Sequence, residues 1–460
     1  MERRPPQSSR LTWLAVAFVA GVCSILGTVG GDAHWLAAIG RTIVARGSIP
    51  AGVPYAAAPS SDWVNVPVLG ELVFHALQAL GGDKALLLFQ LLAATVAFTL
   101  LAFGMRARGA PDAARAAVLL MVFLSAIPAF VILRAQVFSL VLFCALLLLL
   151  RSETKHPSNR IWLLVPLVAL WTNLHGAVLV GLAVSASYLA FERFRRQPVT
   201  SGGVLVACVG ALFLTPALGH SGDYYLGVLR SEAALSGEGM WGPLSPSLQA
   251  PFDLLFVLLI VPLLLLACRR MRLWELVCAA VLVAVTVHAG RNGIWLACLV
   301  AAPAAYGLGR GSLRNFTVSP RALILCGSVP ALFLVLGIIQ TPQQAGAGER
   351  VRQHAATLAA GQPILADGLD AEQFALDRQR VWMANPLDAF SRRDQRLYLD
   401  WLDAKPAGDE LLRRGSPVVV VTRGSPPQQR LARDRSFRRV ALDRHAAVYV
   451  RVSSVREVSR

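Results

Sequence analysis

Asp32 and His34 are the first candidates for chemistry, because they directly follow the first long apolar run of the chain, residues 11–29. A carboxylate there lies at the boundary of membrane and water, where ionisable groups are costly and usually functional. Asp32 could act as a general base on an acceptor hydroxyl, or it could bind a divalent metal. It could also cap the helix expected at Ala33–Arg46, since Asp is a favoured N-cap residue, and these roles are compatible.

Asp62 and Glu71 lie later in the same long loop, residues 31–83. Asp62 could be a second acid of the site, and Glu71 could face a membrane cavity from an amphipathic helix at residues 66–80. Half-apolar helices of this kind, including Ala33–Arg46, can lie in the membrane interface. The alternative is that both acids are ordinary solvated loop residues or helix caps.

Arg134 and Gln136 lie between two apolar runs, and Arg291 and Asn292 follow a third. An arginine in so apolar a setting needs an anionic partner, and its guanidinium fork pairs with two oxygens of a phosphate. The alternative is that the arginines extend to lipid headgroups as interfacial anchors. Arg134, Gln136 and Arg291 are therefore candidate phosphate ligands, and Asn292 is a candidate neighbour of the site.

Asn173 and His175 interrupt apolar sequence, just after Trp171. Polar residues at a helix break can line a cavity, where irregular backbone is tolerated within a membrane. A lone histidine is more often a packing residue with satisfied hydrogen bonds, but the accompanying Asn173 and Gly176 give the two interpretations equal weight. A further outer stretch, Glu238-Gly239-Met240-Trp241, could contribute to an acceptor surface, although a mobile loop is the favoured interpretation.

The elements that must position these residues are membrane helices. The chain has 460 residues, of which 55% are hydrophobic and 15% are charged, and its mean hydropathy is +0.55. A soluble protein would be about 25% charged. Apolar runs near the ~20 residues needed to span hydrocarbon predict about eleven transmembrane helices. They lie at residues 11–29, 85–105, 114–131, 136–150, 161–171, 174–189, 204–218, 251–267, 273–288, 294–308 and 322–339.

The net charge of +17 is concentrated in short loops between alternate apolar runs. This is the positive-inside pattern, and it disfavours a nucleic-acid partner. It predicts a cytoplasmic N-terminus, with the first run retained as a helix, and an extracytoplasmic C-terminus. Asp32 and the other candidates then all lie on the outer side.

Residues 341–460 are polar and mixed in charge, unlike the helical module predicted for residues 1–340. Helical spacing occurs at residues 351–360 and 391–403, and β-branched or apolar runs at residues 363–366, 416–422 and 446–452 predict strands. We therefore expect a small extracytoplasmic α/β domain at the C-terminus.

Other chemistry has no support in the sequence. The seven cysteines lack metal-ligand spacing, and there is no P-loop, dinucleotide fingerprint, HExxH motif or nucleophile elbow. No nucleotide use is indicated, which disfavours an ATP-driven pump.

Short motifs throughout the chain resemble those of the GT-C-type polytopic membrane glycosyltransferases, the group that includes protein O-mannosyltransferases and undecaprenyl-phosphate sugar transferases. In order along the chain they are Gly31-Asp32-Ala33-His34, Asp62-Trp63-Val64-Asn65, Leu69-Gly70-Glu71, Arg134-Ala135-Gln136-Val137-Phe138-Ser139, Trp171-Thr172-Asn173-Leu174-His175-Gly176, Gly290-Arg291-Asn292, Tyr398-Leu399-Asp400-Trp401-Leu402 and Ala447-Val448-Tyr449-Val450-Arg451.

The resemblance implies an inverting glycosyltransferase of the bacterial inner membrane and cell envelope. Its donor would be a polyprenyl-phosphate-linked sugar, its acceptor a saccharide, a lipid or a protein, and its catalytic base Asp32. This family often has two acids close together at that point. Here the second residue is His34, so the use of a divalent metal stays open.

The alternative function is a non-catalytic transporter or scaffold that binds a lipid-linked saccharide, because broken helices with polar residues also occur in transporters. Against it, the candidate residues cluster at one face of the membrane, and the two halves of the chain do not repeat. An enzyme of the outer face is the favoured interpretation.

Overall fold

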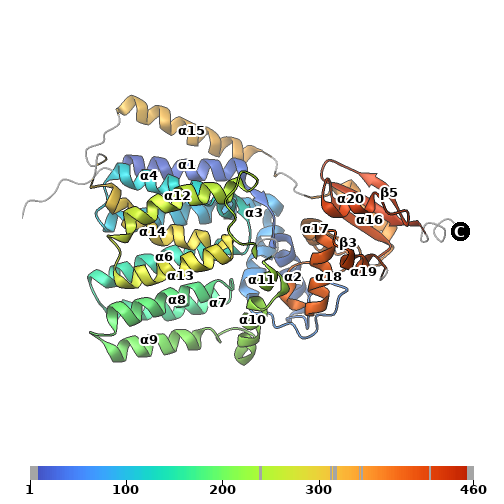
Figure 1. Cartoon of the computed structure of the whole chain (residues 1–460), viewed down its shortest axis with the longest axis horizontal. Coiled ribbons are helices and arrows are strands. Elements are labelled where there is room, and N and C mark those ends of the chain that lie inside the picture. Colours follow the sequence, from blue (N-terminus) through green and yellow to red (C-terminus); the bar gives the residue numbers. More distant parts are fainter. Residues whose placement is uncertain are drawn as a thin grey trace, which may run out of the picture. The chain divides into compact units, whose positions relative to one another are not determined.

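The computed structural model describes residues 9–237, 241–310, 313, 319–340, 342, 346–413 and 416–452, and its described part is mostly helical (Figure 1). The chain divides into two compact units. A helical unit comprises Met1–Gly27, Lys84–Thr215 and Met240–Thr341. A sheet unit comprises Thr28–Asp83, Pro216–Gly239 and Pro342–Arg460.

The helical unit contains a helix at each predicted span. Four helices among the described residues are long and apolar enough to cross a membrane: Val68–Ala107, Gln136–Lys155, Pro251–Cys268 and Arg321–Ile339. The count of eleven spans stays a prediction, since several other apolar helices are shorter. The elements are α1 (Arg10–Leu26), α3 (Val68–Ala107, whose first part belongs to the sheet unit), α4 (Asp112–Ser125), α5 (Ile127–Val131), β2 (Ile132–Leu133), α6 (Gln136–Lys155), η1 (Asn159–Leu163), α7 (Leu164–Thr172), α8 (Val178–Tyr188), η2 (Leu189–Arg193), α9 (Pro198–Ala211), α12 (Pro251–Cys268), α13 (Leu273–His288), η5 (Gly290–Asn292), α14 (Gly293–Leu308) and α15 (Pro320–Ile339).

Helix α14 is the centre of the helical unit. Every residue from Gly293 to Ala305 is buried, as expected for a helix that is apolar all round. It packs against α4, α12 and α13 (Figure 1). Its glycines allow close approach: a Cβ at Gly293 would lie 2.6 Å from the Phe256 ring, and one at Gly307 would lie 2.5 Å from the Leu266 carbonyl oxygen. Small residues at helix crossings are typical of membrane proteins.

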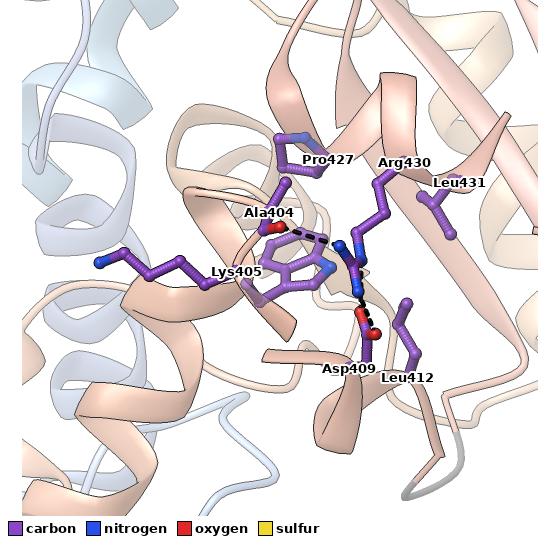
Figure 2. A pocket seen from close by; sticks show the side chains of 8 residues that line it. Ala404, Lys405, Asp409, Leu412, Pro427, Arg430 and Leu431 are labelled. Carbon is purple, nitrogen blue, oxygen red and sulfur yellow. Dashed lines mark hydrogen bonds and ion pairs between the residues drawn. The ribbon is translucent and has the colours of Figure 1, made fainter. Parts of the chain in front are cut away.

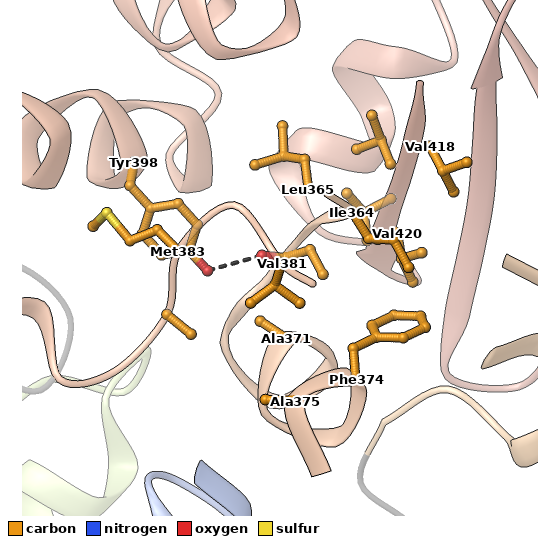
Figure 3. Close-up of a cluster of buried hydrophobic side chains, with 14 of the residues drawn as sticks. Ile364, Leu365, Ala371, Phe374, Ala375, Val381, Met383, Tyr398, Val418 and Val420 are labelled. Carbon is orange, nitrogen blue, oxygen red and sulfur yellow. Dashed lines mark hydrogen bonds between the residues drawn. The ribbon is translucent and has the colours of Figure 1, made fainter. Parts of the chain in front are cut away.

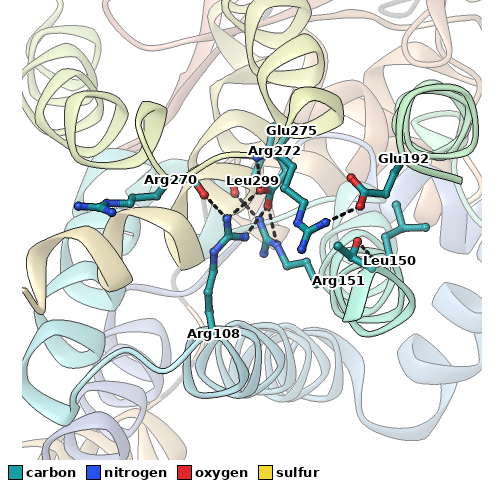
Figure 4. Close-up of polar contacts among 9 residues, drawn as sticks. Arg108, Leu150, Arg151, Glu192, Arg270, Arg272, Glu275 and Leu299 are labelled. Atoms are coloured by element: carbon teal, nitrogen blue, oxygen red, sulfur yellow. Dashed lines mark hydrogen bonds and ion pairs between the residues drawn. The ribbon is translucent and has the colours of Figure 1, made fainter. Parts of the chain in front are cut away.

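Glu275 is an acid buried inside the helical unit, and two arginines neutralise it (Figure 4). Arg108 contacts it through Nη1 at 2.8 Å and Nη2 at 3.0 Å, and Arg151 donates through Nε at 3.1 Å. The Glu275 side chain is fully buried, and the cluster joins the ends of α3, α6 and α13. An outlying pair, Arg272–Glu192, is half-exposed on its arginine side.

The sheet unit contains a four-stranded sheet in the order β3-β4-β6-β5. β3 runs parallel to β4, whereas β4 and β5 are each antiparallel to β6, with Val420 opposite Val448. The strands expected at residues 363–366, 416–422 and 446–452 are present as β3, β4 and β6, while β5 was not expected. The elements are β1 (Thr28–Val29), α2 (Ala33–Arg46), η3 (Leu218–His220), α10 (Ser221–Leu229), α11 (Glu232–Ser236), α16 (Glu349–Ala359), β3 (Leu365–Ala366), α17 (Gly368–Leu376), η7 (Leu387–Ala389), α18 (Arg392–Leu402), η8 (Pro406–Gly408), α19 (Asp409–Arg413), β4 (Val418–Thr422), α20 (Pro426–Leu431), β5 (Phe437–Leu442) and β6 (Ala446–Arg451).

The core of the sheet unit lies between this sheet and the helices around it (Figure 3). Ile364, just before β3, and Val420 of β4 lie on the side of Phe374 of α17, whereas Leu365 lies on the other face of the sheet. Tyr398 of α18 is buried as well, and its hydroxyl donates to the Ala366 carbonyl oxygen at 2.8 Å. The polar end of this buried ring is therefore satisfied.

The loop at residues 31–83 is an integral part of the sheet unit. Trp35, Ile39 and Ile43 of α2 belong to the same buried core, and α2 packs against α17. Burial of this apolar side corrects the expectation that α2 could lie in the membrane interface. Residues 55–58 are hydrogen bonded to the segment at 381–382, and Arg41 Nη1 donates to the Leu376 carbonyl oxygen at 2.7 Å.

Asp370 predicts a pH-dependent stability of the sheet unit. The pKa of its carboxyl is raised to about 7, mainly by burial and next by the charge of Asp367, with a smaller contribution from Asp443; the Ala347 N–H and Arg352 oppose the rise. An unfolded Asp has a pKa near ~3.9. The folded state therefore binds the extra proton, and its stabilising effect is complete below about pH 4 and is lost as the pH rises through about 7.

We expect the free energy of unfolding to fall by about 2 kcal/mol between pH 5.5 and 8 through this group. Thermal unfolding of the full chain in nanodiscs at the two pH values measures it. Asp370→Asn should reduce the pH dependence, while Asp403→Asn, at an exposed position, should retain it. Equal slopes in the wild type and Asp370→Asn would contradict the prediction.

Candidate functional site

Asp32 occupies the N-cap position of α2, but its half-buried side chain does not make the N-cap hydrogen bond. Only its backbone carbonyl takes part, accepting from Leu36 N at 3.0 Å. The capping role considered from the sequence is therefore limited to the backbone position. The carboxylate itself is not used by the helix terminus.

His34 is 4% exposed, and its Nε2 lies 2.8 Å from Oδ1 of Asp83. Burial alone would raise the pKa of Asp83, but the hydrogen bond and charge of His34 outweigh it and hold this pKa below its usual value. Asp83 follows a kink in α3 at Gly81 and Gly82, where Gly82 has φ +59° and ψ −148°, a conformation available essentially to glycine alone. The kink thus places Asp83 beside His34.

Glu71 lies in the part of α3 that precedes the kink and belongs to the sheet unit. It is 1% exposed, and Asn65 Nδ2 donates to its Oε2 at 2.8 Å. Burial raises the pKa of Glu71 to about 8, so the carboxyl is largely protonated at neutral pH. Asp62, in contrast, is exposed on the loop.

Arg134 and Gln136 lie where α6 begins, and both are half-buried. Arg134 precedes the helix, and its carbonyl oxygen accepts from Val137 N at 3.0 Å. Gln136 is the first helical residue. Both therefore lie at the N-terminus of a helix, whose dipole favours an anion.

His175 is linked to α6 by a directed chain of hydrogen bonds. Trp171 Nε1 donates to Ser139 Oγ at 2.6 Å, and Ser139 Oγ lies 2.7 Å from His175 Nδ1. Ala177 N also donates to Nδ1, at 3.3 Å. Because the Ala177 N–H donates to Nδ1, this nitrogen is an acceptor, so Ser139 also donates its proton to Nδ1 and the proton of a neutral His175 lies on Nε2. The imidazole is therefore held as a hydrogen-bond donor through Nε2.

Asn173 stabilises the break after α7. Its amide nitrogen donates to the Ala169 and Leu214 carbonyl oxygens, both at 2.8 Å. These bonds join the end of α7 to the segment after α9. This geometry gives Asn173 a structural role within the helical unit, at the position where the sequence indicated a break.

Arg291 lies over the ring of Trp241, with its guanidinium carbon 4.4 Å from the ring centroid. The Trp241 loop is held there because Gly290 N donates to the Gly242 carbonyl oxygen at 3.0 Å. Stacking on indole orients a guanidinium while leaving its N–H edge for other acceptors. Asn292 Nδ2 donates to the Ala289 carbonyl oxygen at 3.2 Å. Glu238, Gly239 and Met240 lie outside the described residues.

The structure thus groups the predicted residues by unit. The sheet unit holds Asp32, His34, Asp62 and Glu71, and the helical unit holds Arg134, Gln136, Asn173, His175, Arg291 and Asn292. Within the described ranges, no group of three His, Cys, Asp or Glu residues could hold a metal ion. Sequence reasoning missed Asp83 and Ser139, and also Tyr224 and Asp388 of the sheet unit. For Asp83 a signal existed, since it follows two glycines directly before an apolar run.

The sheet unit contains a surface hollow that is not the candidate functional site (Figure 2). It encloses about 190 Å³, including open solvent, between α18, α19 and α20. Its cations are already paired: Arg430 Nε donates to Asp409 Oδ1 at 2.7 Å, and Lys405 Nζ lies 2.9 Å from Asp403 Oδ2. These pairs join surface elements.

Comparison with solved structures assigns the fold to the GT-C class of polytopic membrane glycosyltransferases, the class that the sequence motifs resemble. ArnT from Cupriavidus metallidurans, bound to undecaprenyl phosphate, matches with a TM-score of 0.50 and 16% identity over 97% of this chain and 98% of ArnT. The arabinofuranosyltransferase AftD from Mycobacteria matches with a TM-score of 0.52 and 14% identity over 97% of this chain and 42% of AftD. No protein-family description and no curated protein sequence matches the chain.

Proposed function

We propose that this protein transfers a sugar from a polyprenyl-phosphate-linked donor to an acceptor at the outer face of the bacterial inner membrane. The observation that carries the proposal is the position of Asp32, half-buried at the N-terminus of α2, in a chain with the GT-C fold. The likeness to a structure that contains undecaprenyl phosphate supports a lipid-phosphate donor.

In the proposed reaction, an acceptor hydroxyl attacks the anomeric carbon of the donor. The new carbon–oxygen bond forms as the bond from that carbon to the phosphate oxygen breaks, with inversion, and the polyprenyl phosphate leaves. Asp32 takes the proton of the attacking hydroxyl. Arg134 and Arg291 bind the phosphate, whose negative charge grows in the transition state, with Gln136 beside them. No nucleotide is needed.

The remaining predicted residues have supporting roles in this proposal. The His34–Asp83 pair, at 2.8 Å, fixes the start of α2 and hence the backbone that carries Asp32. The residues proposed to line the site are His34, Asp62, Glu71, Asn173, Asn292 and His175, the last as a donor through Nε2. A divalent metal bound near Asp32 stays part of the proposal to be tested. The N-terminus is cytoplasmic, and the sheet unit is extracytoplasmic.

Arg291→Ala tests the donor site. A hydrogen bond to a charged group contributes about 1.5–3 kcal/mol, so we expect the donor KM to rise about 10- to 150-fold. The measurement is turnover of a radiolabelled polyprenyl-phosphate sugar by the purified protein in nanodiscs. Arg291→Lys, which keeps the charge but loses the planar fork, should recover only part of the affinity.

Arg269→Ala removes the same charge from an exposed position elsewhere in the helical unit and is the matched control. An unchanged KM in Arg291→Ala would remove Arg291 from the donor site. Saturable donor binding that depends on Arg134 and Arg291, without any turnover in the wild type, would instead favour the lipid-linked saccharide transporter or scaffold.

A further inference from the structure

A group of polar and aromatic side chains lies in the sheet unit around the position of Asp32. It consists of Trp63 and Asn65 of the first loop, Glu71 of α3, Tyr224 of α10 and Asp388 of η7; we call it the acid–aromatic cluster. α10 packs against η7, and Trp63 and Leu387 pack against the same hydrophobic core. Asp388, Glu71 and Asp32 are all electrostatic neighbours of Tyr224. Segments far apart in the sequence thus meet at one place.

One buried polar atom in this cluster has no hydrogen-bond partner. Asn65 is 5% exposed, and while its Nδ2 donates to Glu71, its Oδ1 is buried and unpaired. The indole N–H of Trp63 is buried as well, and it is directed at the Asp388 carboxylate, whose pKa this hydrogen bond lowers. Folded proteins satisfy nearly all buried polar atoms, so the unpaired acceptor of Asn65 indicates a ligand that donates a hydrogen bond to it.

The protonation of the cluster indicates what kind of ligand this is. With its pKa raised to about 8, Glu71 is mainly a neutral carboxylic acid that both donates and accepts. Burial also raises the pKa of Asp388, to about 6, so it is mostly ionised at neutral pH. An anion would be repelled by Asp388 and Asp32. A cation would find one carboxylate next to a neutral acid and an indole donor. A neutral ligand with several hydroxyl groups fits every member.

The aromatic rings complete this pattern. Trp63 and Tyr224 are half-buried, so each ring keeps some accessible surface, and Tyr224 lies edge-on to Tyr225 with ring centroids 5.3 Å apart. Aromatic side chains present an apolar face and a polar tip. A sugar ring has the matching character, with C–H groups on its faces and hydroxyls on its rim, whereas an acyl chain would leave the acid and amide groups unpaired.

We propose that the acid–aromatic cluster is a subsite for a saccharide acceptor, in which Asn65, Asp388 and the Trp63 indole bind sugar hydroxyls. This inference rests on the proposed function, in which an acceptor receives the sugar. It narrows the class of acceptor from saccharide, lipid or protein to a saccharide. Asp388 is a binding and positioning residue, while the proton of the attacking hydroxyl goes to Asp32.

The test is direct binding of neutral methyl glycosides (gluco, galacto, manno and arabino) to the purified full chain in nanodiscs, by saturation-transfer difference NMR. The wild type should bind at least one glycoside saturably. Asp388→Asn, which preserves side-chain volume while removing a charge, and Trp63→Phe, which keeps an aromatic ring while removing the indole N–H, should each weaken it at least tenfold. Asp403→Asn, at an exposed position of the same unit, should bind as the wild type does. Unchanged thermal unfolding midpoints show that the variants are folded.

Equal binding by all variants, binding of no glycoside, or preferential binding of a serine-containing peptide would overturn the inference. Release of sugar from a radiolabelled polyprenyl-phosphate donor, measured on the same wild-type sample without acceptor, separates the two claims. Glycoside binding without donor turnover would retain the saccharide subsite and refute the proposed transfer. Donor turnover without glycoside binding would retain the proposed transfer and refute the saccharide subsite.

Discussion

Asp32→Asn is expected to lower the turnover of a polyprenyl-phosphate sugar donor about 10²- to 10⁴-fold, the usual contribution of a general base. Asparagine has the same shape as aspartate but cannot accept the proton of the attacking hydroxyl. The loss should be in kcat, with donor KM nearly unchanged, because Asp32 is not proposed to bind the phosphate. Steady-state kinetics in nanodiscs measure both parameters.

The same substitution should leave the protein folded and inserted. The Asp32 side chain makes no N-cap hydrogen bond, so its loss does not expose the N-terminus of α2, and thermal unfolding should shift little. Asp403→Asn is the matched control for the loss of one exposed carboxylate in the same unit. Full activity of Asp32→Asn would remove this residue from the mechanism.

Glu275→Gln should destabilise the helical unit by about 3–5 kcal/mol, the typical effect of removing one partner of a buried ion pair. Glutamine leaves Arg108 and Arg151 without their counter-charge, and their side chains are only 19% and 11% exposed. The variant is expected to unfold at a clearly lower temperature in detergent or nanodiscs.

Glu192→Gln is the control for this prediction, because its partner Arg272 is half-exposed and such pairs contribute about 0–1 kcal/mol. Similar melting temperatures for the two variants would show that Glu275 is not the electrostatic centre of the unit. A Glu275→Gln variant as stable as the wild type would likewise show that Glu275 is not the electrostatic centre of the unit.

Much of the helical unit was predictable from the sequence, because a long apolar run directly indicates a helix that is removed from water. The helices α6, α12, α13 and α14 lie where the sequence placed them. The arginines between those runs were harder to interpret. Arg108 and Arg151 belong to the positive-inside pattern of the sequence, and in the structure each is also paired with Glu275, which lies 167 and 124 residues away along the chain. Local sequence carries no signal for such a partner.

The sheet unit was harder to predict for the same reason. Asp388 and Tyr224 lie 356 and 192 positions after Asp32, counted along the sequence, so nothing local relates them. Strand β5 was missed because Phe437-Arg438-Arg439-Val440-Ala441-Leu442 is an edge strand with basic, exposed residues, which lacks a β-branched run. The strand Val418–Thr422 was recognisable because it is central and almost entirely buried.

For helix α2 the secondary structure was predicted correctly, but the predicted surroundings of the helix were wrong. Its apolar spacing was recognised, but the same spacing suits a membrane interface and a protein core. The structure buries Trp35, Ile39 and Ile43 in the sheet unit. Only the partner helix α17, more than 300 residues later, decides between the two.

The most direct test of the central claim is release or transfer of sugar from radiolabelled polyprenyl-phosphate sugars by the purified wild-type protein in nanodiscs, with and without added divalent metal. We predict turnover that yields free polyprenyl phosphate and is abolished in Asp32→Asn. Saturable donor binding with no turnover under any condition would contradict the assignment as a glycosyltransferase.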